Sequence, residues 1–82
     1  MKIIQNLIRY DTDKATEIAK LDDGNKDNPI ILYTTDNKNW FTYQDIHNSF
    51  VFLAEKEAAL MLERYNRYDL LEMYFSHLLK DA

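Results

Sequence analysis

Residues 54–65 read AEKEAALMLERY and carry the strongest structural signal in the chain. Alanine, leucine, methionine and glutamate favour a helix, and neither glycine nor proline interrupts the run. The apolar residues that recur at helical spacing along one stripe are Ala54, Ala58, Met61, Leu62 and Tyr65. Such a stripe is stable only when it is buried, so we expect the rest of the chain to cover this helix.

The segment before this helix contains three β-prone runs. Ile30–Thr34 and residues 40–43 flank the polar residues 35–39, a pattern that predicts a hairpin. Residues 45–49 form a polar connection, and residues 50–53 (FVFL) predict a strand that leads directly into the helix.

The N-terminal third predicts a strand followed by a helix. Residues 2–10 (KIIQNLIRY) are rich in β-branched residues and predict one strand or a tight hairpin at the sheet edge. Residues 11–13 (DTD) are typical helix N-caps, and the apolar residues that follow at helical spacing are Ala15, Ile18 and Ala19. This helix is expected to end at residues 22–24, where Gly24 can take the left-handed conformation, before a polar linker over residues 25–29.

The C-terminal part predicts one more helix and completes the fold class. Asn66 and Arg67 break the helical pattern, and Asp69 is expected to cap a helix whose apolar stripe is Leu71, Tyr74, Phe75 and Leu78. The sequence therefore predicts one α+β domain over residues 1–82. It has an antiparallel sheet of three or four strands, with three helices packed mainly on one face. The predicted order is strand, helix, strand, strand, strand, helix, helix.

Composition excludes several function classes. Fourteen acidic and ten basic side chains give a net charge of −4, which argues against nonspecific nucleic-acid binding. The chain has no cysteine, and its two histidines, His47 and His77, lie on different elements, so we expect no metal site and no cofactor. No catalytic motif is present, so we expect no enzyme. No apolar run could serve as a signal peptide or cross a membrane, which predicts a cytoplasmic protein without a membrane partner.

Aromatic residues on the predicted hairpin are the first candidate binding residues. The chain has six tyrosines in addition to Trp40, and tyrosine and tryptophan are enriched at protein interfaces. The aromatic residues that alternate across the hairpin are Tyr33, Trp40, Phe41 and Tyr43, so one face is core and the other could bind a partner. Of these, Tyr33, Trp40 and Tyr43 are candidate partner-binding residues, together with Asp36 and Asn37 of the loop. The alternative is that all the aromatic side chains pack inside the protein.

Acidic residues concentrate in the first third of the chain, and those assigned to the candidate partner surface are Asp11, Asp13, Glu17, Asp22 and Asp23. They could steer a basic partner or mimic nucleic-acid phosphates, although interleaved lysines dilute the mimicry, and a solvated face is the simpler alternative. Residues 23–27 begin like a calcium-binding loop, but Asn28 and Thr34 occupy the positions of its glycine and bidentate glutamate, which argues against calcium.

Three stretches taken together resemble a known group of proteins: KII…RYDTDKATEIA, LYTTDNKNWF and LAEKEAALMLERYNRYDLLEMYF…LKDA. The chain is similar over most of its length to small uncharacterised proteins encoded by phages, prophages and conjugative elements of Gram-positive bacteria. In this chain Lys38 replaces the hairpin glycine of the group, and the glycine-rich insertion after the hairpin is reduced to TYQDIHNS. The resemblance implies a mobile-element origin, and small proteins of this kind are often inhibitors of bacterial defence, including anti-CRISPR proteins.

These observations favour a small non-enzymatic protein that binds and inhibits another protein in a bacterial host cell, with a component of a CRISPR-Cas-type defence complex as the expected target. One alternative is a nucleic-acid-binding regulatory module, which requires Lys2, Arg9, Arg64, Arg67 and Lys80 to converge on one face. Another is a homodimeric structural protein that pairs through the last helix, around Tyr68, Met73 and Leu79.

Overall fold

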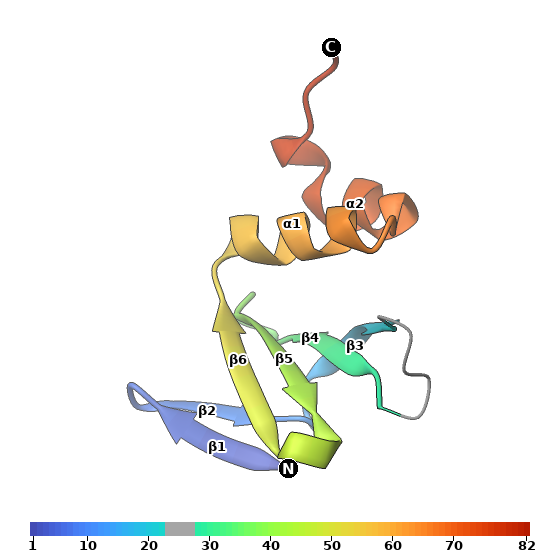
Figure 1. Cartoon of the computed structure of the whole chain (residues 1–82). Helices are drawn as coiled ribbons and strands as arrows, with labels where there is room; N and C mark the ends of the chain where they lie inside the picture. Colours follow the sequence, from blue (N-terminus) through green and yellow to red (C-terminus); the bar gives the residue numbers. More distant parts are fainter. Residues whose placement is uncertain (23–27) are drawn as a thin grey trace.

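The structure is a computed structural model that describes residues 1–22 and 28–82. Within these ranges the chain forms two antiparallel sheets and two α-helices (Figure 1). The strands are β1 (Lys2–Gln5), β2 (Ile8–Asp11), β3 (Thr16–Leu21), β4 (Ile30–Thr34), β5 (Trp40–Gln44) and β6 (Ser49–Leu53). The helices are α1 (Glu55–Arg64) and α2 (Tyr68–Phe75), and the 3₁₀ turns η1 (Asp45–His47) and η2 (Ser76–Leu78) follow β5 and α2.

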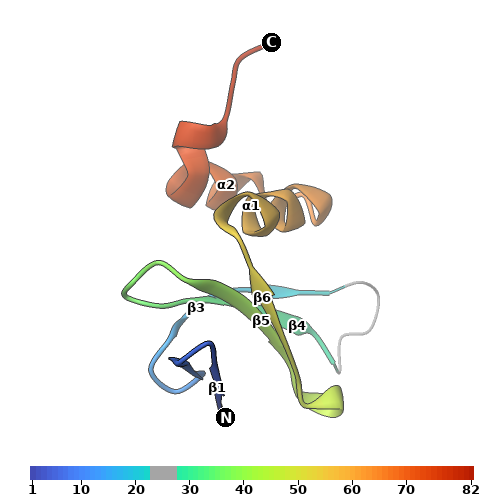
Figure 2. The ribbon, with the colours of Figure 1, turned by 90° about the vertical axis from the view of Figure 1, so that its left-hand side faces the viewer.

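The molecule has three layers. The middle layer is a four-stranded antiparallel sheet with the order β3-β4-β5-β6. Helices α1 and α2 cover one face of this sheet, and the β1–β2 hairpin crosses the other face (Figures 1 and 2). Successive residues of a strand point to opposite faces. Leu32 and Trp40 therefore pack toward the helices, whereas Tyr33 and Phe41 pack toward the hairpin.

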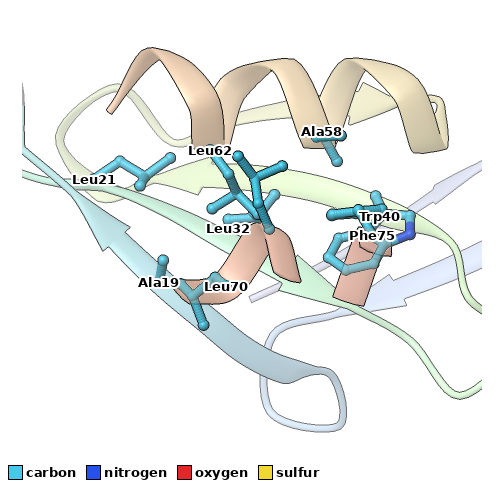
Figure 3. Packing of buried hydrophobic residues seen from close by; sticks show 10 residues of the cluster. Ala19, Leu21, Leu32, Trp40, Ala58, Leu62, Leu70 and Phe75 are labelled. Atoms are coloured by element: carbon cyan, nitrogen blue, oxygen red, sulfur yellow. The ribbon is translucent and has the colours of Figure 1, made fainter. Parts of the chain in front are cut away.

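The core between the sheet and the helices is mainly aliphatic (Figure 3). Leu32 of β4 is fully buried against the helix layer, and Leu21 of β3 lies beside it. Phe75, the last residue of α2, packs on Trp40 of β5 with ring centroids 4.7 Å apart. This contact fixes the end of α2 on the sheet.

The core between the sheet and the hairpin is aromatic. Phe41 is fully buried at its centre, with its ring centroid 5.4 Å from that of Tyr10 and 5.1 Å from that of Tyr33. The Tyr10 ring also lies 4.5 Å from that of Phe52. Tyr10 belongs to β2, so these contacts hold the hairpin on the sheet.

Helix α1 confirms the prediction for residues 54–65. Within the predicted stripe, Ala58 and Leu62 are fully buried, and Met61 and Tyr65 are partly buried. Ala54, the N-cap, is exposed. The Glu57 carboxylate accepts a hydrogen bond from the Ala54 backbone N–H at 2.8 Å. This bond is half of a capping box and fixes the start of the helix.

Helix α2 is confirmed, but its predicted cap is wrong. Arg67 is the N-cap, because its carbonyl oxygen accepts a hydrogen bond from the Leu71 N–H at 3.1 Å. Asp69 therefore lies in the first turn, 3.5 Å from the Arg67 guanidinium, where it still favours the positive end of the helix dipole. The buried residues are Leu70, Leu71 and Phe75, whereas Tyr74 and Leu78 of the predicted stripe are exposed.

The helix predicted to follow residues 11–13 is wrong, because Thr16–Leu21 forms strand β3. Asp11 closes a turn instead of capping a helix. Its Oδ1 accepts a hydrogen bond from the Asp13 N–H at 3.0 Å, and its carbonyl oxygen accepts one from the Ala15 N–H at 2.9 Å. An aspartate can either cap a helix or close a turn, and the local hydrogen bond of the Asp11 side chain favours the turn here.

A β-bulge explains why β3 resembles a helix in the sequence. The register between β3 and β4 shifts between Glu17 and Ala19, so Ile18 and Ala19 both pack in the helix-side core, with Leu21 two residues later. The predicted three-helix architecture and its element order are therefore corrected: the described residues contain two α-helices, and three strands precede β4. The helix end at Gly24, and all of the linker except residues 28 and 29, lie outside the described residues.

Residues 2–10 take the hairpin form of their prediction. Asn6 and Leu7 make the turn with φ angles of 55° and 65°, the two positive values of a type I′ turn. The hairpin is not at the edge of the main sheet, as predicted, but forms a separate two-stranded sheet. Ile3 and Tyr10 face the main sheet and pack in the aromatic core.

Candidate functional site

The aromatic residues predicted as partner anchors are core residues. Tyr33, Trp40 and Tyr43 are only 8, 7 and 5% exposed. Tyr33 stacks on Phe41, and the Tyr43 ring lies 4.8 Å from that of Phe50. The helices cover one face of these strands and the β1–β2 hairpin covers the other, so neither face presents the aromatic residues to a partner. The predicted exposed anchors are therefore absent, and core packing, the alternative, describes these residues.

The acidic residues of the candidate surface are divided between the two ends of β3. Asp11 ends β2, Asp13 lies in the turn that follows and Glu17 lies near the start of β3. Asp22 follows the last residue of β3. Asp23 lies outside the described residues. The structure therefore does not place the described acids on one continuous face.

One end of the sheet does gather several predicted residues. Asp11 lines a shallow depression of ≈ 290 Å³ together with Asp36 and Asn37 of the β4–β5 loop. Arg9 and Lys14 line the same depression, so its charge is mixed. This arrangement joins the β2–β3 turn to the β4–β5 loop but does not create an acidic patch.

A larger groove lies on the other side of the β4–β5 loop, between this loop and the helix layer. We call it the loop groove; it has a volume of ≈ 400 Å³ and its lining includes Thr34, Asp36, Lys38, Trp40, Glu55, Met73, Tyr74 and His77. The Tyr74 ring meets the Trp40 ring edge-on at 6.0 Å, which gives part of the lining an aromatic character. Asp36 and Glu55 contribute carboxylates to the same groove, and its size falls in the range of ligand-binding clefts.

The loop that borders the groove is closed by its own hydrogen bonds. The Thr35 N–H donates to the Asn39 carbonyl at 3.0 Å, and the Lys38 N–H donates to the Thr35 carbonyl at 2.8 Å. The Thr35 hydroxyl accepts from the Asn39 N–H at 3.2 Å. Asp36 and Asn37, at the tip, are exposed. The loop is thus preorganised, which lowers the entropy that a partner must overcome.

On the helix side of the groove, a side-chain hydrogen bond joins two elements. The His77 Nε2 of η2 lies 2.8 Å from Glu55 Oε1 at the start of α1, and both side chains are about half exposed. From the sequence we expected no metal site at His77. Across residues 1–22 and 28–82, no group of three or more histidine, aspartate or glutamate side chains is placed to hold a metal ion.

The exposed apolar residues of the β1–β2 hairpin were not predicted as site residues. Leu7 at the hairpin turn is 97% exposed, and Ile4 and Ile8 beside it are also exposed. On the helix layer, Met73 and Leu79 are exposed, as the dimer alternative required. The positive φ angle and full exposure of Leu7 could not be predicted from the sequence, in which only the turn preference of Asn6 indicates a tight turn.

The basic residues required for a nucleic-acid surface are divided between layers. Lys2 and Arg9 belong to the hairpin, whereas Arg64 and Arg67 belong to the helix layer on the opposite side of the sheet. The convergence that the nucleic-acid alternative requires is therefore not present among these four residues. None of the described helices is long and apolar enough to cross a membrane.

Two core tyrosines have raised pKa values. Burial raises the pKa of Tyr33, and the nearby carboxylates of Glu17 and Asp13 raise it further. Burial also raises the pKa of Tyr43, whose hydroxyl donates a 3.0 Å hydrogen bond to the Asp45 carboxylate. Both groups are neutral in the folded protein at physiological pH.

The free energy of unfolding is expected to decrease above about pH 10, the ordinary tyrosine pKa. A folded-state pKa above the unfolded-state value stabilises the fold below the unfolded pKa, and this contribution is lost as the pH rises through the folded pKa. Denaturant unfolding between pH 8 and 11.5 measures the decrease. The Tyr33→Phe variant should show a smaller decrease than the wild type, and identical pH profiles would contradict the role of Tyr33.

Comparison of the chain with family models, with curated proteins and with solved structures found no match.

Proposed function

We propose that this chain acts by binding another protein, and that the loop groove is its contact site. The observation that carries the proposal is the composition of the groove: an aromatic and apolar lining beside two carboxylates, next to a loop that is already closed by hydrogen bonds. Energetically important interface residues commonly occupy such pockets. Trp40 and Asp36, which the sequence suggested for separate reasons, both line this groove.

The groove favours a positively charged anchor on the partner. An arginine or lysine side chain could lay its apolar stem along Tyr74 and Met73 and direct its charge toward Asp36 or Glu55. Lys38 on the same lining reduces the local negative potential, but the net charge of −4 favours a basic surface at longer range. We therefore propose a partner with an exposed basic side chain within a basic surface.

The resemblance to mobile-element proteins leads to the second part of the proposal, which is that the partner belongs to a bacterial defence system. Defence proteins that handle nucleic acids carry basic surfaces for their substrate, because phosphate binding requires Lys and Arg. This chain could bind such a basic surface through the loop groove, which carries Asp36 and Glu55, and so block the nucleic-acid site of the defence protein. The inhibition would be stoichiometric and would need no catalysis.

The test is an affinity capture with the tagged full-length chain from the lysate of a phage-susceptible host, analysed by mass spectrometry, with the tag alone as the control. A parallel sample is treated with nuclease. The proposal predicts that the same protein is enriched in both samples and that this protein has a basic surface. Recovery of no specific protein, or enrichment that disappears after nuclease treatment, would contradict it.

A further inference from the structure

Strand β6 is an apolar edge of the main sheet. Within the described residues it pairs only with β5, so the N–H and C=O groups along its other side have no neighbouring strand. Its sequence SFVFL contains no charged residue, no proline and no glycine. Val51, at its centre, is 49% exposed. Edges of this kind readily pair with further strands, and proteins usually protect them.

The opposite edge of the same sheet, β3, is protected. A register shift interrupts it between Glu17 and Ala19, and the charged side chains of Glu17 and Lys20 are exposed along it. Bulges and charges are the usual devices that prevent pairing at an edge. The two edges therefore differ, and only β6 is suited to accept another strand.

We propose that β6 pairs antiparallel with β6 of a second copy of this chain, to form a two-fold symmetric dimer. The strand is self-complementary about Val51: when Val51 lies opposite Val51 of the partner subunit, Phe50 lies opposite Phe52 of the partner subunit. The aromatic pairs then share the hairpin-side face, where such cross-strand pairs are favourable, and the two valines cover each other on the helix-side face.

The β1–β2 hairpin extends past β6 toward the position that the second copy would occupy (Figure 1). Tyr10 lies over Phe52 of β6, with ring centroids 4.5 Å apart. Ile8 is two residues nearer the turn, on the same side of the hairpin and about 6.6 Å away. Neighbouring strands are about 4.8 Å apart, so Ile8 faces the position of the next strand. In the proposed register Phe50 of the partner subunit, opposite Phe52, would lie at this position.

The proposed pairing also stops at two copies. It consumes both β6 edges and leaves a β3 edge at each end of the combined sheet, where the bulge and charges disfavour further pairing. It does not depend on the loop groove, since no residue of β6 lines that groove. Failure of partner capture and failure of dimerisation are therefore separate results.

Sedimentation velocity of the full chain over a wide concentration range tests the dimer, and the proposal predicts a concentration-dependent monomer–dimer equilibrium. Val51→Lys should weaken dimerisation about tenfold or more, because it places two ammonium groups opposite each other at the symmetry axis. The matched control is Ile46→Lys, at a residue that is 62% exposed in η1 and outside the strand, which should leave dimerisation unchanged. A dimer that persists in Val51→Lys, or a monomer at all concentrations, would overturn the proposal.

Cysteine crosslinking gives a second test that does not require a destabilising charge. The natural chain has no cysteine, so the disulfide of a Val51→Cys variant can form only between copies. Mild oxidation with copper–phenanthroline should crosslink Val51→Cys rapidly. Ile46 lies outside the paired strand, in η1, so two Ile46→Cys side chains would lie beyond opposite ends of the strand pair, outside disulfide range, and should not react. Preferential crosslinking of Leu79→Cys in the C-terminal segment would overturn pairing through β6 and favour the helix dimer.

Discussion

Replacing Phe41 with alanine is expected to lower the free energy of unfolding by about 3–5 kcal/mol. Phe41 is fully buried, and its ring contacts those of Tyr10, Tyr33 and Phe50. Truncation removes these contacts and leaves a cavity between the sheet and the β1–β2 hairpin. The amides of the hairpin should lose protection from hydrogen exchange first, because the hairpin packs on the sheet through Tyr10, which contacts Phe41. Denaturant unfolding measures the total loss, and amide hydrogen exchange locates it.

The control for Phe41→Ala is Ile46→Ala, at an exposed residue outside both cores, where a change of less than about 0.5 kcal/mol is expected. A loss below about 1 kcal/mol in Phe41→Ala, or unchanged exchange of the hairpin amides, would mean that the hairpin does not cover the sheet as described.

Replacing Phe75 with alanine should also cost about 3–5 kcal/mol, but through the helix layer. Phe75 is nearly fully buried and packs on Trp40, the only tryptophan in the chain. Its loss should detach the end of α2 and expose the indole to water. Unfolding measurements give the energy, and the fluorescence emission of Trp40 in the folded variant should shift to longer wavelength.

Met73→Ala is the matched control for Phe75→Ala, because Met73 belongs to the same helix and is mostly exposed. It should change stability by less than about 0.5 kcal/mol and leave the emission maximum in place. If Phe75→Ala behaved like this control, the contact between α2 and the sheet would not hold the helix layer. A domain of this size has a total stability of roughly 5–10 kcal/mol, so each core variant removes a large share.

Most of the chain after residue 29 was predictable from local patterns. The β4–β5 hairpin, β6 and both helices have uninterrupted periodicity and clear boundaries, such as the polar loop at residues 35–39. The cap of α2 was misplaced by two residues, because Asp69 suits the first turn of a helix as well as the N-cap position. Errors of this kind alter a boundary and not the architecture.

The error at β3 has a different cause. Ala15, Ile18 and Ala19 fit the spacing of a helix. They do not fit the alternating pattern of a regular strand, because a β-bulge places Ile18 and Ala19 on the same face, and a bulge cannot be predicted from that pattern. Asp11 can cap a helix or close a turn, and only the pairing of β3 with β4 decides between them. Tertiary pairing therefore overrode the local pattern.

The candidate site was predicted only in part, because burial depends on the third layer. Tyr33 and Tyr43 point to the hairpin side of the sheet and Trp40 to the helix side, as alternation along strands requires. The tyrosine face is covered by a hairpin that the sequence placed at the sheet edge. Asp36 and Asn37 remain exposed at the loop tip, and Asp36 also lines the loop groove. Met73 and Tyr74 reach this groove from α2, a proximity between distant segments that no local pattern contains.

The central claim is that a basic protein partner binds at the loop groove, and a pair of charge reversals tests it most directly. Asp36→Lys changes the charge in the groove, and Glu63→Lys makes the same change on the exposed surface of α1, outside the groove lining. Quantitative capture from host lysate should show at least about a tenfold loss of the partner with Asp36→Lys, a difference of about 1.4 kcal/mol, and little loss with Glu63→Lys. Equal retention of the partner by both variants, or equal loss, would contradict binding at this groove.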